Sequence, residues 1–220
     1  MKLILAYKGV EWQDCASSLG DDRSGMKTNK DGIYPYRQSP SYQDDDALPP
    51  LSPTIAALPQ SNAILRHLAR QHDLYGAKGS LREAADVDVV LEGVESQRMS
   101  YIQLIYVKQL SEEAKKEYSA LHLDKAAADN ARNNGAHFAY LADYIAASGK
   151  DGWAVGAQAT VADFALAELV GLHLRIFGDE LRQGFPSLVA HHDKIMALPG
   201  VKEYVASPKC LPQINNNGLG

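Results

Sequence analysis

The chain has 220 residues, of which 45% are hydrophobic, and its 22 lysines and arginines face 27 acidic residues, for a formal net charge of -5. This length suits one large domain or two small ones, and the acidic balance argues against nucleic acid as a partner because it offers no basic face to a phosphate backbone. No apolar run approaches the roughly 18 residues of a membrane span, so we expect no membrane partner and a cytoplasmic protein.

The first eight residues form a short, mostly apolar segment, and Gly9 follows it. This pattern predicts the end of a helix followed by a turn. Residues 10–15 then alternate between apolar and polar, as a half-buried strand does. Residues 16–32 have the composition of a loop. Residues 44–59 combine an acidic run with four prolines, which excludes a regular central strand and predicts an exposed, poorly ordered insertion.

The placement of proline divides the chain in two. Six of the ten prolines lie within residues 35–59, whereas residues 60–185 contain none. Because proline breaks helix interiors, the long proline-free stretch permits continuous helices. We therefore predict a turn-rich first domain over residues 1–77 and an all-helical second domain over residues 80–220.

Several helices are expected beyond the proline cluster. Ser61 is predicted to cap a helix over residues 62–74, which Gly76 ends. Ser80 and Glu83 fit a capping box at the start of a long helix that runs to about residue 108. Further helical patterns cover residues 112–119, 125–147, 161–177 and 188–197.

The motifs resemble those of a known family. The string Gln60-Ser-Asn-Ala-Ile-Leu-Arg-His-Leu-Ala-Arg70 is similar to the glutathione-binding helix start of cytosolic glutathione transferases, nearest the pi, mu and sigma classes. Thr160-Val-Ala-Asp163 and the following Phe164 resemble that family's buried capping box and hydrophobic staple. The resemblance covers nearly the whole chain, most strongly from Gln60 onward. It implies an α/β plus all-α architecture, with a thioredoxin-like N-terminal domain, an all-helical C-terminal domain, and a homodimer.

The resemblance implies that Gln60 and Ser61 bind the γ-glutamyl end of glutathione. Ser61 lies where a helix begins, so its backbone N–H, its hydroxyl and the positive helix end together suit a carboxylate. Taken alone, the same serine would be interpreted as a plain N-cap.

A second glutathione-binding segment is implied at Gln38 and Ser39. With Pro40 they match the family's Gln-Leu-Pro, whose cis proline turns a backbone amide and carbonyl toward the cysteinyl part of glutathione, although Ser39 departs from the usual apolar residue. The lysine that contacts the glycyl carboxylate is either Lys27 or Lys30.

The second domain contributes further implied roles. Tyr106 matches a pi-class tyrosine that faces the electrophile pocket, where its phenol could stabilise developing charge, and the alternative is an ordinary core tyrosine. Thr160 and Asp163 are structural, and losing such a cap costs ~1 kcal/mol. The resemblance also implies contacts across the dimer interface. Arg66 and Arg70 would pair with Asp88 and Glu92 of the partner, the alternative being two solvated helix faces. The ring of Tyr36 would insert into the neighbouring subunit.

The catalytic residue is not identified. The family's first strand carries a tyrosine that stabilises the glutathione thiolate, and we expect this strand to be missing, since the sequence resembles the family only from the end of the first helix. Tyr7 precedes the Gly9 turn and is assigned to packing. The insertion at residues 44–59 would replace most of the fourth strand. A lost first exon with a retained intron would produce this pattern, and so would a diverged relative.

Metal chemistry is not expected. Cys15 and Cys210 stand alone, which suggests neither a disulfide framework nor a zinc site. The adjacent His191 and His192 lack the spacing of a helical zinc site and are predicted to lie on the surface.

The leading hypothesis is a glutathione transferase that conjugates the glutathione thiolate to electrophilic hydrophobic compounds, with glutathione as co-substrate and no further cofactor. The alternatives are a catalytically impaired dimerisation or docking module of the same fold and a sigma-like, glutathione-dependent isomerase.

Overall fold

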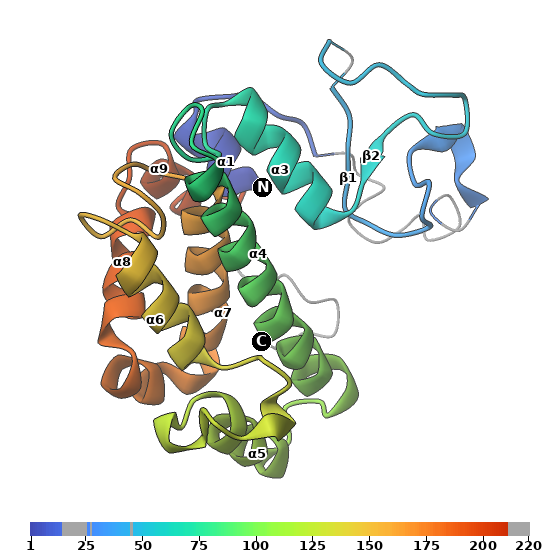
Figure 1. Cartoon of the computed structure of the whole chain (residues 1–220). Helices are drawn as coiled ribbons and strands as arrows, with labels where there is room; N and C mark the ends of the chain where they lie inside the picture. The colour runs from blue at the N-terminus through green and yellow to red at the C-terminus, as the bar shows by residue number, and fades with distance from the viewer. Residues whose placement is uncertain (15–25, 27, 45, 211–220) are drawn as a thin grey trace. The chain divides into compact units, whose positions relative to one another are not determined.

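A computed structural model describes residues 1–14, 26, 28–44 and 46–210 (Figure 1). The chain forms two compact units, the first ending at His72 and the second beginning at Asp73. This division lies a few residues before the predicted one. No described helix is both long enough and apolar enough to cross a membrane.

The first unit opens with α1, Lys2–Tyr7, which buries Ile4 and Leu5. The helix ends in the predicted turn, where Gly9 adopts a φ of 65° and the Val10 N–H donates to the Leu5 carbonyl at 2.9 Å. The strand predicted for residues 10–15 is wrong over its described part, residues 10–14. A strand requires a paired neighbour, and within the described first unit the two named strands pair only with each other. Cys15 lies outside the described residues.

The two short strands form an antiparallel pair. β1, Ser41–Tyr42, pairs with β2, Leu58–Pro59, with Ser41 opposite Pro59 and Tyr42 opposite Leu58. The last two residues of the predicted insertion therefore form a short strand, and the segment before them takes the place where a longer strand was expected to be missing. Pro59 is tolerated because it stands at the end of a very short strand.

The proline-rich segment is also hydrogen-bonded to the short 3₁₀ helix η2, Lys30–Gly32, and its preceding residue. The Asn29 side-chain amide donates to the Thr54 carbonyl at 2.8 Å, and the Ala56 N–H donates to the Gly32 carbonyl at 2.9 Å. A Cβ on Gly32 would lie 2.5 Å from the Pro53 carbonyl oxygen. The expected exposure of the prolines is observed at Pro49, Pro50 and Pro53, but the segment is anchored rather than a free insertion.

α3, Ser61–Gln71, follows β2 and buries Ile64, Leu68 and Ala69. Gln60 is its N-cap, because the Gln60 carbonyl accepts the first helical hydrogen bond, from the Ile64 N–H at 3.0 Å. Ser61 is thus the first helical residue, and its predicted position as the cap is wrong by one residue.

The second unit is a helical bundle in which α7 packs against both α4 and α8, and α6 packs against α4. Its long helix α4 ends in a π-helical turn, η3. In chain order the elements are α4, Leu81–Ile102; η3, Gln103–Val107; α5, Glu112–His122; η4, Lys125–Ala127; η5, Ala131–Asn133; α6, Phe138–Ser148; α7, Val161–Gly184; α8, Pro186–Met196; and α9, Val201–Val205.

The single helix predicted over residues 125–147 is wrong. Two 3₁₀ turns precede α6, because side chains there bond to nearby backbone groups and compete with a continuous helix. The Asn130 side-chain oxygen accepts from the Arg132 N–H at 3.0 Å, Asn134 adopts a φ of 52°, and His137 Nδ1 accepts from the Ala139 N–H at 3.0 Å.

The capping box at the start of α4 is half formed. Ser80 Oγ accepts from the Glu83 N–H at 3.2 Å, as predicted. The Glu83 carboxylate instead accepts from the Ala77 N–H at 2.6 Å, while the Ser80 N–H donates to the Ala77 carbonyl. Glu83 therefore ties the chain entering α4 to the helix rather than closing the box.

Candidate functional site

The candidate glutathione site of the first unit lies where β1 and β2 pair. The peptide bond between Ser39 and Pro40 is cis, as the resemblance implies. The antiparallel register of Ser41 with Pro59, extended by one residue, sets Pro40 opposite Gln60. The sheet therefore brings the cis-proline segment next to the start of α3, although the two are far apart in sequence.

The start of α3 is open to a ligand. Gln60 adopts a φ of 72° and a ψ of 116°, and its side chain makes no capping hydrogen bond. The first N–H groups of a helix have no partner within it, and the helix dipole makes that end positive. Ser61 adds a half-buried hydroxyl at the same point. The arrangement can hold a carboxylate by backbone N–H groups and one hydroxyl.

The neighbouring segment presents its polar groups to solvent. Gln38 and Ser39 are exposed, and Pro40 is half-buried. A tight turn precedes them, in which the Arg37 N–H donates to the Tyr34 carbonyl at 2.9 Å. Of the two candidate lysines, Lys27 lies outside the described residues, and the side chain of Lys30 is not described either.

A polar group that the sequence did not suggest holds the far end of the sheet to α3. Asp44 accepts hydrogen bonds from the Tyr42 hydroxyl at 3.2 Å and from the Gln71 side-chain amide at 3.1 Å. The pKa of Asp44 is lowered, chiefly by a hydrogen bond from the Ala47 N–H and next by the hydrogen bond from Gln71. The pKa of Tyr42 is raised to about 12, mainly by burial and secondly by the negative charge of Asp44. These contacts stabilise the strand that follows the cis proline.

Tyr106 of the second unit lies in the π-helical turn η3 and is 47% exposed. In this turn the Lys108 N–H donates to the Gln103 carbonyl at 3.0 Å, five residues back, so the helix is locally wider. Such turns are frequent at functional sites. This exposure distinguishes Tyr106 from an ordinary buried core tyrosine.

Tyr101, one turn earlier, is the buried counterpart. It is 3% exposed, and burial raises its pKa to about 12. Its ring lies 4.6 Å from that of His173. The Tyr118 hydroxyl donates to His173 Nε2 at 2.7 Å and accepts from the Gln97 side-chain amide at 2.6 Å. These groups form a polar cluster inside the bundle beneath η3.

The residues predicted for a dimer interface are distributed over both units. Tyr36 is 63% exposed, Arg66 and Arg70 lie one turn apart on α3, and Asp88 and Glu92 lie one turn apart on α4. Asp88 also accepts a hydrogen bond from the Tyr75 hydroxyl at 2.6 Å, which fixes its carboxylate.

Asp163 forms a larger buried network than the capping motif predicts. Its Oδ2 accepts from the Thr160 N–H at 2.7 Å and from the Thr160 hydroxyl at 2.9 Å. Its Oδ1 accepts from the Ala154 N–H at 2.7 Å and from His191 Nε2–H at 2.8 Å. His191 is 5% exposed, so its predicted surface position is wrong: its Nε2–H is paired with Asp163 inside the bundle.

Known proteins resemble this chain in sequence and in fold. A family model described as "Glutathione S-transferase, C-terminal domain" matches residues 98–208. "Glutathione S-transferase P 1" of Bufo bufo is 35% identical over 222 aligned residues, which cover 99% of this chain and 91% of that protein. "Glutathione S-transferase P" of Homo sapiens is 33% identical over 224 aligned residues, with the same coverage. The solved Pi-class glutathione S-transferase of Onchocerca volvulus covers 99% of this chain and 91% of its own, with a TM-score of 0.75 and 26% identity.

Proposed function

This chain belongs to the cytosolic glutathione transferase family, and we infer that it binds glutathione and conjugates the glutathione thiolate to electrophilic, hydrophobic compounds. The observation that carries this proposal is the β1–β2 register, which sets the cis peptide between Ser39 and Pro40 beside the uncapped start of α3. A peptide with a carboxylate at one end and an extended backbone fits these two neighbours.

Each part of the peptide has a complementary group. The N–H groups at the start of α3, with the Ser61 hydroxyl and the Gln60 side chain, bind the γ-glutamyl carboxylate. The backbone of Ser39 exchanges hydrogen bonds with the cysteinyl residue, which holds its sulfur in a fixed position. No described residue is assigned to stabilise the thiolate.

The reaction forms a bond between the glutathione sulfur and an electrophilic carbon, while a leaving group departs with its electron pair or negative charge develops on the acceptor. The Tyr106 hydroxyl donates a hydrogen bond to that charge, and the Tyr106 ring packs against the apolar substrate. Orientation of the two reactants supplies the remaining rate enhancement.

The family membership also supports a cytoplasmic homodimer. We assign its contacts to Tyr36, Arg66 and Arg70 of one protomer and to Asp88 and Glu92 of its partner. α4 additionally exposes the apolar side chains of Val89 and Met99, which are 47% and 48% exposed in the single chain. Sedimentation equilibrium of the purified chain tests this assembly.

Glutathione titration by calorimetry, together with conjugation of chlorodinitrobenzene, tests the function. Ser61→Ala should weaken glutathione binding about tenfold or more, because a hydrogen bond to a charged group contributes about 1.5–3 kcal/mol. Ser52→Ala, in the proline-rich segment, is the matched control and should bind normally. Firm binding without conjugation would indicate a docking module, and the absence of binding by a folded chain would refute the glutathione site.

A further inference from the structure

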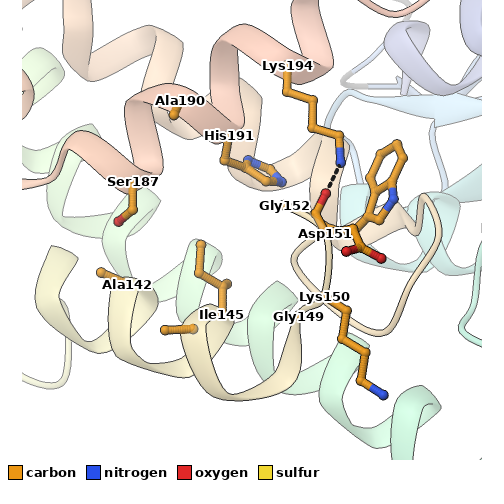
Figure 2. A pocket seen from close by; sticks show the side chains of 12 residues that line it. Ala142, Ile145, Gly149, Lys150, Asp151, Gly152, Ser187, Ala190, His191 and Lys194 are labelled. Atoms are coloured by element: carbon orange, nitrogen blue, oxygen red, sulfur yellow. Dashed lines mark hydrogen bonds between the residues drawn. The ribbon is translucent and has the colours of Figure 1, made fainter.

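A cavity of about 490 Å³ lies in the second unit, between α6 and α8 (Figure 2). The loop formed by residues 149–153 closes one end of it. Ligand pockets of small molecules typically have volumes of about 300–1,000 Å³. None of the lining residues is among those assigned to glutathione, to the electrophile or to the dimer contact, so the cavity needs a separate explanation.

The two helices give the cavity an apolar wall of small side chains. Ala142, Ile145 and Ala146 line it from α6, and Ala190 lines it from α8. Ala142 and Ala146 lie one turn apart and therefore on the same helix face. Because three of the four apolar residues are alanines, the helices leave a space that larger side chains would fill.

A lysine and a tryptophan stand at the closed end. Lys194 Nζ donates to the Asp151 carbonyl at 2.8 Å (Figure 2). It also lies 3.4 Å from the centroid of the Trp153 ring. The carbonyl fixes the ammonium with one of its three N–H groups, and the other two remain for a ligand. Loss of solvation lowers the pKa of Lys194, as expected for an ammonium partly withdrawn from water.

The ammonium group of Lys194 gives the cavity a place for an anion. It stands at the closed end, whereas the exposed side chain of Lys150 points away from the cavity (Figure 2). Two carboxylates lie near Lys194, that of Asp151 and that of the buried Asp163, which is already hydrogen-bonded to His191. A hydrogen bond from an ammonium to a carboxylate is stronger than one between neutral groups, so a ligand carboxylate can compete for Lys194.

The loop is held in place before any ligand binds. The Lys150 N–H donates to the Gly156 carbonyl at 2.8 Å, the Gly156 N–H donates to the Ser148 carbonyl at 3.0 Å, and the Trp153 N–H donates to the Lys150 carbonyl at 3.0 Å. Behind it, the buried pair of His191 and Asp163 joins α8 to the start of α7. A preformed pocket loses little conformational entropy on binding.

We propose that this cavity binds a small aromatic carboxylate, whose ring lies against the alanine wall and Trp153 and whose carboxylate pairs with Lys194. The alanine wall favours an apolar body, and the ammonium of Lys194 favours a negative group at its end. This site is independent of the proposed transferase function, because it uses other residues.

Naphthoate and its uncharged analogue naphthamide are suitable probes, since they share one ring system and differ in charge. The chain contains two tryptophans, Trp12 and Trp153. In a full-length Trp12→Phe variant the fluorescence therefore reports on Trp153 alone, and calorimetry of the unsubstituted chain gives an independent dissociation constant.

The variants separate charge from shape. Lys194→Met keeps the stem and removes the ammonium, so it should weaken naphthoate about fivefold and leave naphthamide unchanged. Ala190→Phe fills the cavity from α8 and should weaken both probes by more than about tenfold. Ala146→Leu repeats the test from α6, which guards against misfolding of either variant. Lys116→Met, an exposed lysine on α5 outside the cavity, should change neither affinity.

Three results would overturn the proposal. The first is no saturable change in Trp153 fluorescence at millimolar naphthoate. The second is an equal loss for both probes in Lys194→Met, because a charge interaction must discriminate between them. The third is displacement of naphthoate by S-hexylglutathione, which would place the probe in the glutathione and electrophile site instead.

Discussion

Asp163 should stabilise the second unit by more than a helix cap does. Its carboxylate is fully buried and accepts four hydrogen bonds, two from Thr160, one from the Ala154 N–H and one from His191. Asp163→Ala removes all four acceptor contacts while the donors stay inside the bundle. The perturbation is therefore the loss of a cap together with the creation of unpaired buried donors.

The magnitude follows from these contacts. Removal of a cap costs about 1 kcal/mol. The N–H groups of Ala154 and His191 then lack an acceptor in the interior, which adds about 1–2 kcal/mol each. We expect Asp163→Ala to lower the free energy of unfolding by about 3–5 kcal/mol and the melting temperature by about 10 °C.

Urea unfolding followed by far-ultraviolet circular dichroism measures this loss. Asp163→Asn retains one oxygen but turns an amide NH₂ toward donors, so it should cost about half as much as the alanine variant. Asp143→Ala removes an exposed acid on α6 and should change stability by less than about 0.5 kcal/mol. A loss of about 1 kcal/mol or less in Asp163→Ala would refute the reasoning, because the contacts to Ala154 and His191 would then contribute nothing.

Three further outcomes are expected. Burial lowers the pKa of His173 to about 4, so between pH 7 and pH 4.5 the unfolded chain binds a proton at this histidine that the folded chain does not bind. The free energy of unfolding should therefore fall by about 2–3 kcal/mol over this range, which urea unfolding at both pH values checks. His173→Gln should flatten the pH dependence. Gly32→Ala should destabilise the first unit by about 2 kcal/mol, because Gly32 has a φ of 69° and the new Cβ would meet Pro53; Trp12 fluorescence follows the unfolding, and an unchanged midpoint would contradict the contact. Ser80→Ala should cost about 1 kcal/mol by thermal melting, whereas Ser80→Asp, which restores an acceptor, should recover most of it.

The helical unit could largely be predicted from sequence because its elements depend on local patterns. The family and its two-part fold, identified from the motifs, are confirmed. The apolar spacing of α4 and the capping residues Ser80 and Thr160 lie close to the elements that they specify. The break before α6 was missed because it depends on competing side-chain hydrogen bonds at Asn130 and His137, which periodicity does not register.

The parts that escaped prediction depend on distant contacts. His191 lies inside the bundle, where it is hydrogen-bonded to Asp163, 28 residues earlier in the chain. The residues next to His191 in sequence therefore do not indicate its burial. The π-helical turn at Tyr106 has no sequence signature that we recognise. The strand predicted for residues 10–15 has the alternation of a strand but, over its described residues 10–14, no described partner, and alternation alone does not form a sheet.

The glutathione-site assignments came from the family string rather than from physics. The string from Gln60 to Arg70 identified Gln60 and Ser61, and the match to the family's Gln-Leu-Pro identified Gln38 and Ser39. The β1–β2 pairing explains how two such separated segments meet. Their individual roles stay predictions. The sequence could not show this pairing, because the strands are two residues long and too short for any period to be visible.

The pairing of β1 with β2 also bears on how the chain can change over time. The register of an antiparallel pair sets which residues lie opposite each other. When the two strands are joined by a long connection, the length of that connection does not change these partners. Insertions or deletions between Tyr42 and Leu58 would therefore leave Pro40 facing Gln60 as long as Ser41 still meets Pro59. Residues of the connection other than its anchored positions, such as Thr54 and Ala56, can therefore be gained, lost or replaced while the site is inherited intact.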